Sequence, residues 1–179
     1  MKKKLKRKVH QDWSGDRFDP RELRDYLAEF PVGLRAADLD YRIVVPSRRR
    51  PHLMAGVLRI LPTAYVSIAE EEVEAYTEAG LDENRLMVHS NSVNTLAKKR
   101  NWIFDNTPEE CCIQADDDLI AVVCRIGKKP RRFKDPGAVL QVVENSVRVA
   151  KEMGVPAFCW SRTINIRQGQ FKECDPITL

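Results

Sequence analysis

The chain has 179 residues, which is enough for one ordinary domain with its own core, and its apolar content of 43% excludes broad disorder. No apolar run approaches the roughly 20 residues that a membrane-spanning helix needs, and no apolar stretch follows the basic first residues as it would in a secretory signal. The five cysteines show neither disulfide nor zinc spacing, which favours a reducing compartment. We therefore expect a cytoplasmic protein that does not enter a membrane.

The net charge of +4 originates in the first residues. Lysines and arginines between Lys2 and Lys8 contribute six positive charges, so the remainder carries −2. We interpret residues 1–40 as a basic N-terminal extension and residues 41–179 as the domain. Such an extension attracts nucleic acid through its charge, although a solvated terminus is the plainer interpretation.

From residue 41 onward, short β-branched runs alternate with segments of helical periodicity. The predicted strands are 41–45, 64–68, 85–89, 111–115 and 157–160, with a further apolar stretch at 119–125. The predicted helices are 21–30, 53–61, 71–79, 95–104 and 136–154. This alternation predicts an α/β fold in which a mostly parallel, Rossmann-like sheet carries helices on both faces. Such sheets bind ligands outside the carboxyl ends of their strands.

Three consecutive aspartates, Asp116, Asp117 and Asp118, follow the apolar fourth strand directly. In extended chain Asp116 and Asp118 share a face and Asp117 points away. Carboxylates this close repel each other unless a cation lies between them, and Mg²⁺ or Mn²⁺ prefers such oxygen ligands. The alternative is a solvated acidic turn, but an exposed turn needs no apolar segment on either side.

The segment Ala97-Lys98-Lys99-Arg100-Asn101, read together with Ala115-Asp116-Asp117-Asp118, resembles the GT-A glycosyltransferases of the large inverting family two. The first strand and its exit, 43–47, are similar to the strand that opens the nucleotide pocket in that family. A narrower likeness, over residues 41–125, is to glycosyltransferases of phages and bacteria associated with TET/JBP-type base oxygenases. That likeness implies hydroxymethylated pyrimidines in DNA as acceptors and, for a phage protein, the host cytoplasm as location.

The resemblance implies a UDP- or GDP-sugar donor and a bound Mn²⁺ or Mg²⁺. Pro46, Ser47 and Arg48 would line the nucleoside pocket, and Glu70 would lie near the base or ribose. Arg100 would reach the base or diphosphate. Asp116 would approach the ribose and the metal, and Asp118 would hold the metal. A planar guanidinium suits a phosphate or a nucleobase edge on physical grounds as well. The competing interpretation of Arg100 is a helix-surface ion pair with Asp105 or Glu109.

The sequence departs from the family pattern in two places. The second strand ends in Ala69-Glu70-Glu71, where many members of the family have an acidic pair. The chain also ends soon after the predicted fifth strand. For this second reason we expect either a truncated chain or a short version with an incomplete acceptor side. An inverting transfer needs a carboxylate to accept the proton of the acceptor hydroxyl. Glu173 and Asp175 are the only acidic residues after Trp160 and are the candidates by elimination.

Two other functions stay open. A nucleotidyltransferase of related fold would need a glycine-rich loop after the first strand, and 47–50 contains no glycine. A non-catalytic nucleic-acid-binding module with a degenerate transferase fold would use the basic tail and the basic segment 127–134, which we expect to be a loop. No phosphate-binding loop with Gly-Lys and no Gly-x-Gly-x-x-Gly pattern is present, which argues against a P-loop kinase and a dinucleotide oxidoreductase.

Overall fold

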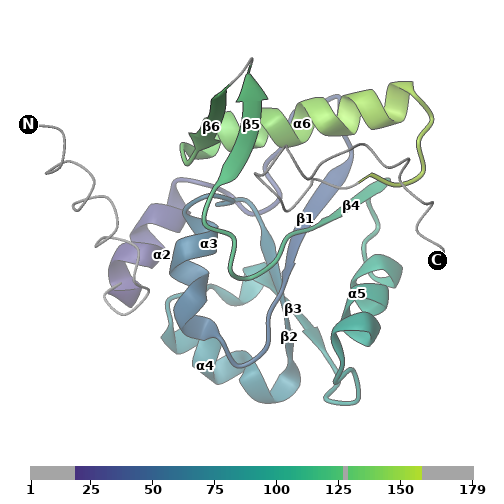
Figure 1. Cartoon of the computed structure of the whole chain (residues 1–179). Coiled ribbons are helices and arrows are strands. Elements are labelled where there is room, and N and C mark those ends of the chain that lie inside the picture. Colours follow the sequence, from purple (N-terminus) through teal and green to yellow (C-terminus); the bar gives the residue numbers. More distant parts are fainter. Residues whose placement is uncertain (1–18, 127–128, 159–179) are drawn as a thin grey trace, which may run out of the picture.

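Four parallel strands form the centre of the fold in the computed structural model, which describes residues 19–126 and 129–158 (Figure 1). The strands are β1 (Tyr41–Pro46), β2 (Tyr65–Ala69), β3 (Leu86–His89) and β4 (Cys111–Gln114), in the spatial order β3-β2-β1-β4. Parallel pairing aligns Val45 with Val66 and Ile43 with Ile113. The predicted α/β, Rossmann-like fold with a parallel sheet is therefore confirmed.

Helices cover both faces of this sheet, as predicted. One face packs against α2 (Pro20–Ala28), α3 (Met54–Leu58), α4 (Val73–Glu78) and α6 (Pro136–Glu152), and the other face packs against α5 (Leu96–Asp105). The alternation of side chains along β1 explains the division. Ile43 and Val45 join the larger apolar cluster, whereas Val44 packs with Met87 and with Ile103 of α5.

Short 3-10 turns precede three of these elements: η2 (Pro51–Leu53), η3 (Glu70–Glu72) and η4 (Glu83–Arg85). The side chain of Thr95 caps α5 by accepting a hydrogen bond from the Lys98 amide at 3.2 Å. Asp19 and Asp135 cap α2 and α6 in the same way. Leu23 and Leu27 of α2 are buried in the larger cluster, so the segment before residue 41 contributes to the core.

The segment after β4 differs from the prediction. β5 (Val122–Ile126) pairs with β6 (Lys129–Phe133) in a separate antiparallel sheet, so residues 129–133 of the expected basic loop form a strand. Its proline and arginines do not give the apolar alternation typical of a strand. The segment is a strand because it pairs with β5. Residues 157–158 are not in a strand, and 159–160 of the predicted fifth strand lie outside the described residues.

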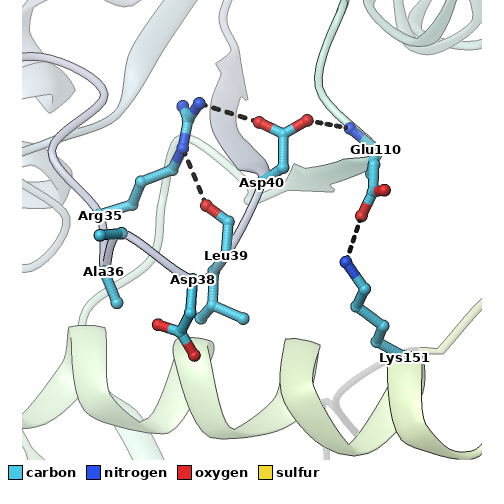
Figure 2. Close-up of a pocket in the computed structure, with 8 residues that line it drawn as sticks. Arg35, Ala36, Asp38, Leu39, Asp40, Glu110 and Lys151 are labelled. Carbon is cyan, nitrogen blue, oxygen red and sulfur yellow. Dashed lines mark hydrogen bonds and ion pairs between the residues drawn. The ribbon is translucent and has the colours of Figure 1, made fainter.

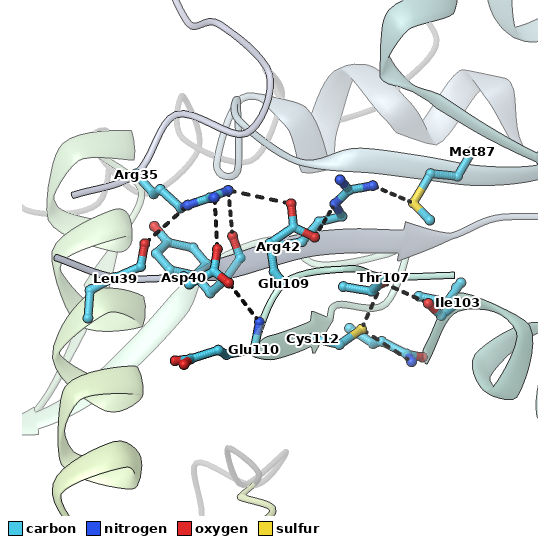
Figure 3. A network of polar contacts seen from close by, with 12 residues as sticks. Arg35, Leu39, Asp40, Arg42, Met87, Ile103, Thr107, Glu109, Glu110 and Cys112 are labelled. Atoms are coloured by element: carbon cyan, nitrogen blue, oxygen red, sulfur yellow. Dashed lines mark hydrogen bonds and ion pairs between the residues drawn. The ribbon is translucent and has the colours of Figure 1, made fainter. Parts of the chain in front are cut away.

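At the amino ends of β1 and β4, charged side chains form a continuous network (Figure 3). Glu109 lies 2.8 Å from Nε of Arg42 and 3.5 Å from Nη1 of Arg35. Arg35 also pairs with Asp40 at 2.9 Å, and the Arg42 guanidinium lies 4.3 Å from the centre of the Tyr65 ring. We call this group (Arg35, Asp40, Arg42 and Glu109) the amino-edge network.

A polar hollow of about 380 Å³ opens beside that network (Figure 2). Lys151 of α6 reaches across its rim to Glu110 at 2.7 Å, and the Glu110 amide donates to Asp40 at 3.0 Å. The charged groups around the hollow are thus engaged with one another. No helix in the described part of the chain is both long and apolar enough to cross a membrane.

Candidate active site at the carboxyl edge of the sheet

The carboxyl ends of β1 and β4 lie side by side in the sheet. We call the region outside these two strand ends the crevice, after the position at which parallel sheets bind ligands. The chain leaves β1 toward α3 on one face and enters β4 from α5 on the opposite face, so the connections diverge at this point. A divergence of this kind is the topological switch point at which open parallel sheets bind ligands. The residues that follow β1 and β4, together with the start of α5, form the walls of the candidate site.

One wall is the loop 47–50 that follows β1, which we call the β1-exit loop. Ser47 is 2% exposed, and its amide donates to the Ser67 carbonyl of β2 at 3.0 Å. Arg49 has a φ of 54°, a left-handed conformation that is uncommon outside glycine. The buried Glu72 carboxylate accepts the Arg49 amide and, with its other oxygen, the Ala69 amide at 3.2 Å. The strained residue is thus held by a specific buried acceptor.

Side chains from two other elements contact this loop. The Tyr76 hydroxyl of α4 donates to Ser47 Oγ at 2.7 Å, and Ser47 Oγ donates to Asp117 Oδ2 at 3.0 Å. The other carboxylate oxygen of Asp117 lies 3.1 Å from Nη1 of Arg50. Asp117 therefore connects the exit of β4 directly to both ends of the β1-exit loop.

Lys99 reaches the same loop from α5. It is 4% exposed, and its ammonium donates to the Ser47 carbonyl and, at 3.4 Å, to the Ser67 carbonyl. Burial lowers the pKa of Lys99, and the nearby Arg48 lowers it further, while Glu72 and Asp117 act in the opposite direction. The lysine thus supplies a buried positive charge directly beneath the crevice.

Arg100 and Asp116 form the opposite wall. Arg100 Nη2 lies 2.8 Å from Asp116 Oδ1, and both side chains are about two-fifths exposed, at 39% and 41%. The Gln114 side-chain amide donates to the Arg100 carbonyl at 3.0 Å, which ties the helix to the end of β4. The guanidinium is thus positioned at the crevice and remains accessible to solvent.

Several polar atoms between α5 and the sheet have no hydrogen-bond partner within the described residues. They are Ser67 Oγ, His89 Nε2, Arg100 Nε and Gln114 Oε1. His89 is 2% exposed, its ring lies edge-on to Trp102 with centroids 5.4 Å apart, and burial lowers its pKa. A polar layer therefore continues from the crevice under α5.

Most of the residues predicted for the site meet at this edge, and the rest divide into two groups. Pro46 and Ser47 end β1, Arg100 and Asp116 face each other, and Arg48 is exposed with its guanidinium on the Asn94 carbonyl ahead of α5. Glu70 is exposed directly after β2, and Asp118 is exposed in the turn that follows β4. Glu173 and Asp175 lie outside the described residues.

The predicted alternation along the acidic cluster does not hold. The strand ends at Gln114, and the chain then turns, with the Leu119 amide donating to the Asp116 carbonyl at 3.3 Å. Asp117 consequently points to the β1-exit loop instead of away from the crevice. Asp117 and Asp118 lie in a turn, so the alternation of side chains in extended chain does not apply to them.

The donor atoms suit a hard cation that shares its coordination with phosphate oxygens. Asp116 offers a carboxylate beside Arg100, and the exposed Asp118 follows it by two residues. Mg²⁺ is commonly held by one or two carboxylates plus substrate phosphates. Within residues 19–126 and 129–158, no three His, Cys, Asp or Glu side chains are grouped as a metal site. A cage made of protein ligands alone therefore does not fit this part of the chain.

Sequence reasoning gave no role to Lys99, Glu72 or Asp117. Lys99 precedes Ile103 by four residues, and this spacing places both on the buried face of α5. Helical periodicity alone could thus have identified Lys99 as a buried cation. Glu72 and Asp117 act on residues distant in sequence, and no local pattern indicates those contacts.

Comparison of the chain with protein-family models, with curated proteins and with solved structures finds no match.

Proposed function

We propose that this chain is a GT-A-type glycosyltransferase domain that binds a UDP- or GDP-sugar at the carboxyl edge of its sheet. The observation that carries the proposal is the convergence of Ser47, Arg100 and Asp116 at the switch point between β1 and β4. A switch point suits a nucleotide, and a half-exposed arginine beside carboxylates suits a diphosphate with its cation.

Each residue has a specific part in this proposal. Pro46, Ser47 and Arg48 border the nucleoside, and Glu70 lies toward the base or ribose. Arg100 donates to the diphosphate, for which its planar fork is well matched. Asp116 and Asp118 hold Mn²⁺ or Mg²⁺, which when bound neutralises the charge that develops on the leaving diphosphate.

The proposed reaction is an in-line displacement. The acceptor oxygen forms a bond to the anomeric carbon, the bond from that carbon to the diphosphate oxygen breaks, and the hydroxyl proton passes to a carboxylate base. Glu173 and Asp175 remain the candidates for that base. The proposed acceptor is a hydroxymethyl group on a pyrimidine in DNA, supported by the basic residues of β6 and of the N-terminal tail.

Titration calorimetry with UDP and with GDP, each in the presence and absence of Mn²⁺, tests the proposal. We expect binding of one nucleotide to depend on the metal, and we expect Asp118→Asn to reduce that dependence. Asp105→Asn, which changes an exposed aspartate at the end of α5, is the matched control and should bind as the wild type does. Failure of every nucleoside diphosphate to bind with metal would contradict the proposal.

An activity assay and a DNA-binding assay separate the two alternative functions. A nucleotidyltransferase would release pyrophosphate from a nucleoside triphosphate. A nucleic-acid-binding module would bind DNA without any sugar-nucleotide turnover, and Asp118→Ala would leave that binding intact.

A further inference from the structure

The middle aspartate of the acidic cluster ends a hydrogen-bond chain that crosses three elements. The Arg50 amide donates to the Tyr76 hydroxyl at 3.3 Å, Tyr76 donates to Ser47 Oγ at 2.7 Å, and Ser47 donates to Asp117 at 3.0 Å. The chain starts and ends on residues that also pair directly, because Asp117 and the Arg50 guanidinium lie 3.1 Å apart. The contacts form a closed ring around the β1-exit loop.

The direction of each hydrogen bond in this ring is determined. A backbone amide only donates and a carboxylate only accepts, so the two hydroxyls between them must both donate toward Asp117. Burial raises the pKa of the Tyr76 phenol, which keeps its proton available for Ser47. Tyr76 itself is fully buried, at 0% exposure, and so has no alternative partner in water.

The ring engages both ends of a loop whose backbone is strained. Arg49 occupies the left-handed region with a φ of 54°, between the two residues that the ring engages. Asp117 is 12% exposed at its side chain, whereas its partner Arg50 is 54% exposed. The buried end of the pair is therefore anchored while the guanidinium stays at the surface of the crevice.

We propose that Asp117 and Tyr76 are positioning residues that hold Ser47 and Arg50 toward the nucleotide, which divides the three aspartates between ligand binding and loop orientation. This inference rests on the proposed function. Asp116 and Asp118 act on the ligand and its cation, whereas Asp117 acts through the β1-exit loop. Asp117, which the alternation of the sequence predicts to point away from the site, is thus the aspartate that orients the β1-exit loop.

Four variants test the ring by nucleotide affinity in the presence of Mn²⁺. Tyr76→Phe removes the hydroxyl that donates to Ser47 and accepts from the Arg50 amide, and it keeps the buried aromatic side chain. We expect roughly tenfold weaker nucleotide binding. Asp117→Asn keeps an acceptor for Ser47 but loses the ion pair, so its effect should be smaller than that of Asp117→Ala. The double variant Tyr76→Phe/Asp117→Asn should bind about as weakly as the worse single variant, because both changes break one ring.

Matched controls isolate the ring from general effects of the substitutions. Tyr26→Phe also removes a phenolic donor, here from α2 to the carbonyl of Arg59 at the end of α3, at 3.0 Å. Asp105→Asn removes an exposed carboxylate. Both should keep wild-type affinity, and variants that bind like these controls, or effects that simply add, would overturn the inference.

Hydrogen exchange of the Arg50 amide distinguishes failure of this inference from failure of the proposed function. We expect Asp117→Asn to speed that exchange although Asp117 does not contact the amide, because the ring couples the two. A wild type that binds no nucleotide would end the proposed function and the ligand-positioning role with it. In that case, faster exchange of the Arg50 amide in Asp117→Asn would still support the hydrogen-bond ring. Exchange at the wild-type rate would contradict the ring as well.

Discussion

The two edges of the parallel sheet carry similar charged residues but use them differently. At the amino edge, Glu109 joins Arg35 and Arg42, and Glu109 is only 9% exposed at its side chain (Figure 3). At the carboxyl edge, Arg100 pairs with Asp116 while both remain about two-fifths exposed. The amino edge therefore uses charge to join elements, and the carboxyl edge keeps the Arg100–Asp116 pair accessible to solvent.

Backbone conformation separates the edges in the same way. The carboxyl edge contains Arg49, the only non-glycine residue of the described chain with a left-handed backbone. Backbone strain tends to lie where a protein binds or reacts, because the surrounding structure must hold such residues in place. The comparison predicts that substitutions at the amino edge reduce stability, and that substitutions at the carboxyl edge reduce ligand affinity.

The largest expected effect is that of Glu109→Gln at the amino edge. The change leaves the Arg42 guanidinium, only 17% exposed, without its carboxylate, and we expect about 2–3 kcal/mol less free energy of unfolding. Urea denaturation measures this loss. Nucleotide affinity should stay at the wild-type value, and a selective loss of affinity without loss of stability would reverse the assignment of the two edges.

Arg100→Ala should show the opposite pattern. Loss of the guanidinium is expected to weaken metal-dependent nucleotide binding by roughly tenfold, because it removes a charge-assisted contact to phosphate. Stability should change by less than about 1 kcal/mol, since the Asp116 pair is solvent-exposed. The control is Lys98→Ala, which changes an exposed lysine of α5 two residues before Arg100. An equal loss of affinity in both variants would count against a specific role of Arg100.

His89→Phe should flatten the dependence of stability on pH below neutrality. Burial lowers the pKa of folded His89 below its ordinary value of 6.5, so the unfolded chain takes up a proton first. Stability is therefore lost as the pH falls from 6.5 toward the lower folded value. Denaturation at about pH 7 and at about pH 5 measures the difference. The exposed His52, changed to Phe, should leave the wild-type slope intact, and an unchanged slope in His89→Phe would refute the assignment.

Lys151→Ala should produce the smallest effect. The Lys151–Glu110 pair spans the amino-edge hollow, but both side chains are more than half exposed, at 58% and 62% (Figure 2). Solvent screens such a pair, so we expect no measurable change in unfolding or in nucleotide affinity. A clear loss of nucleotide affinity would indicate that the hollow, rather than the switch point, is the ligand site.

The alternating pattern of the sequence was sufficient for the parallel sheet and its helices. β1 through β4 lie within about one residue of their predicted bounds, because each is a short apolar run ended by a polar or turn residue. β6 was not predictable, since its basic residues and Pro130 resemble a loop and its pairing depends on β5. Propensity cannot reveal pairing that another strand provides.

The candidate site was predictable only where residues act through their own strand ends. Ser47 and Asp116 follow the strands β1 and β4, where parallel sheets bind ligands. Arg100 lies on α5, and only the resemblance to family-two glycosyltransferases indicated it. The role of Asp117 was missed because the turn after Gln114 redirects its side chain toward a loop 70 residues earlier. Such contacts depend on the three-dimensional path of the chain.

Mapping of backbone amide signals during titration with a nucleoside diphosphate and a metal ion tests the central claim most directly. Mg²⁺ reports the nucleotide contacts through shifted signals, and Mn²⁺ broadens the amides nearest to the metal. We predict changes confined to residues 47–50, 70, 99–100 and 115–118, with the strongest broadening at 116–118. Changes centred on the amino edge at 35–41 and 109–111, or no saturable change at all, would contradict a nucleotide site between β1 and β4.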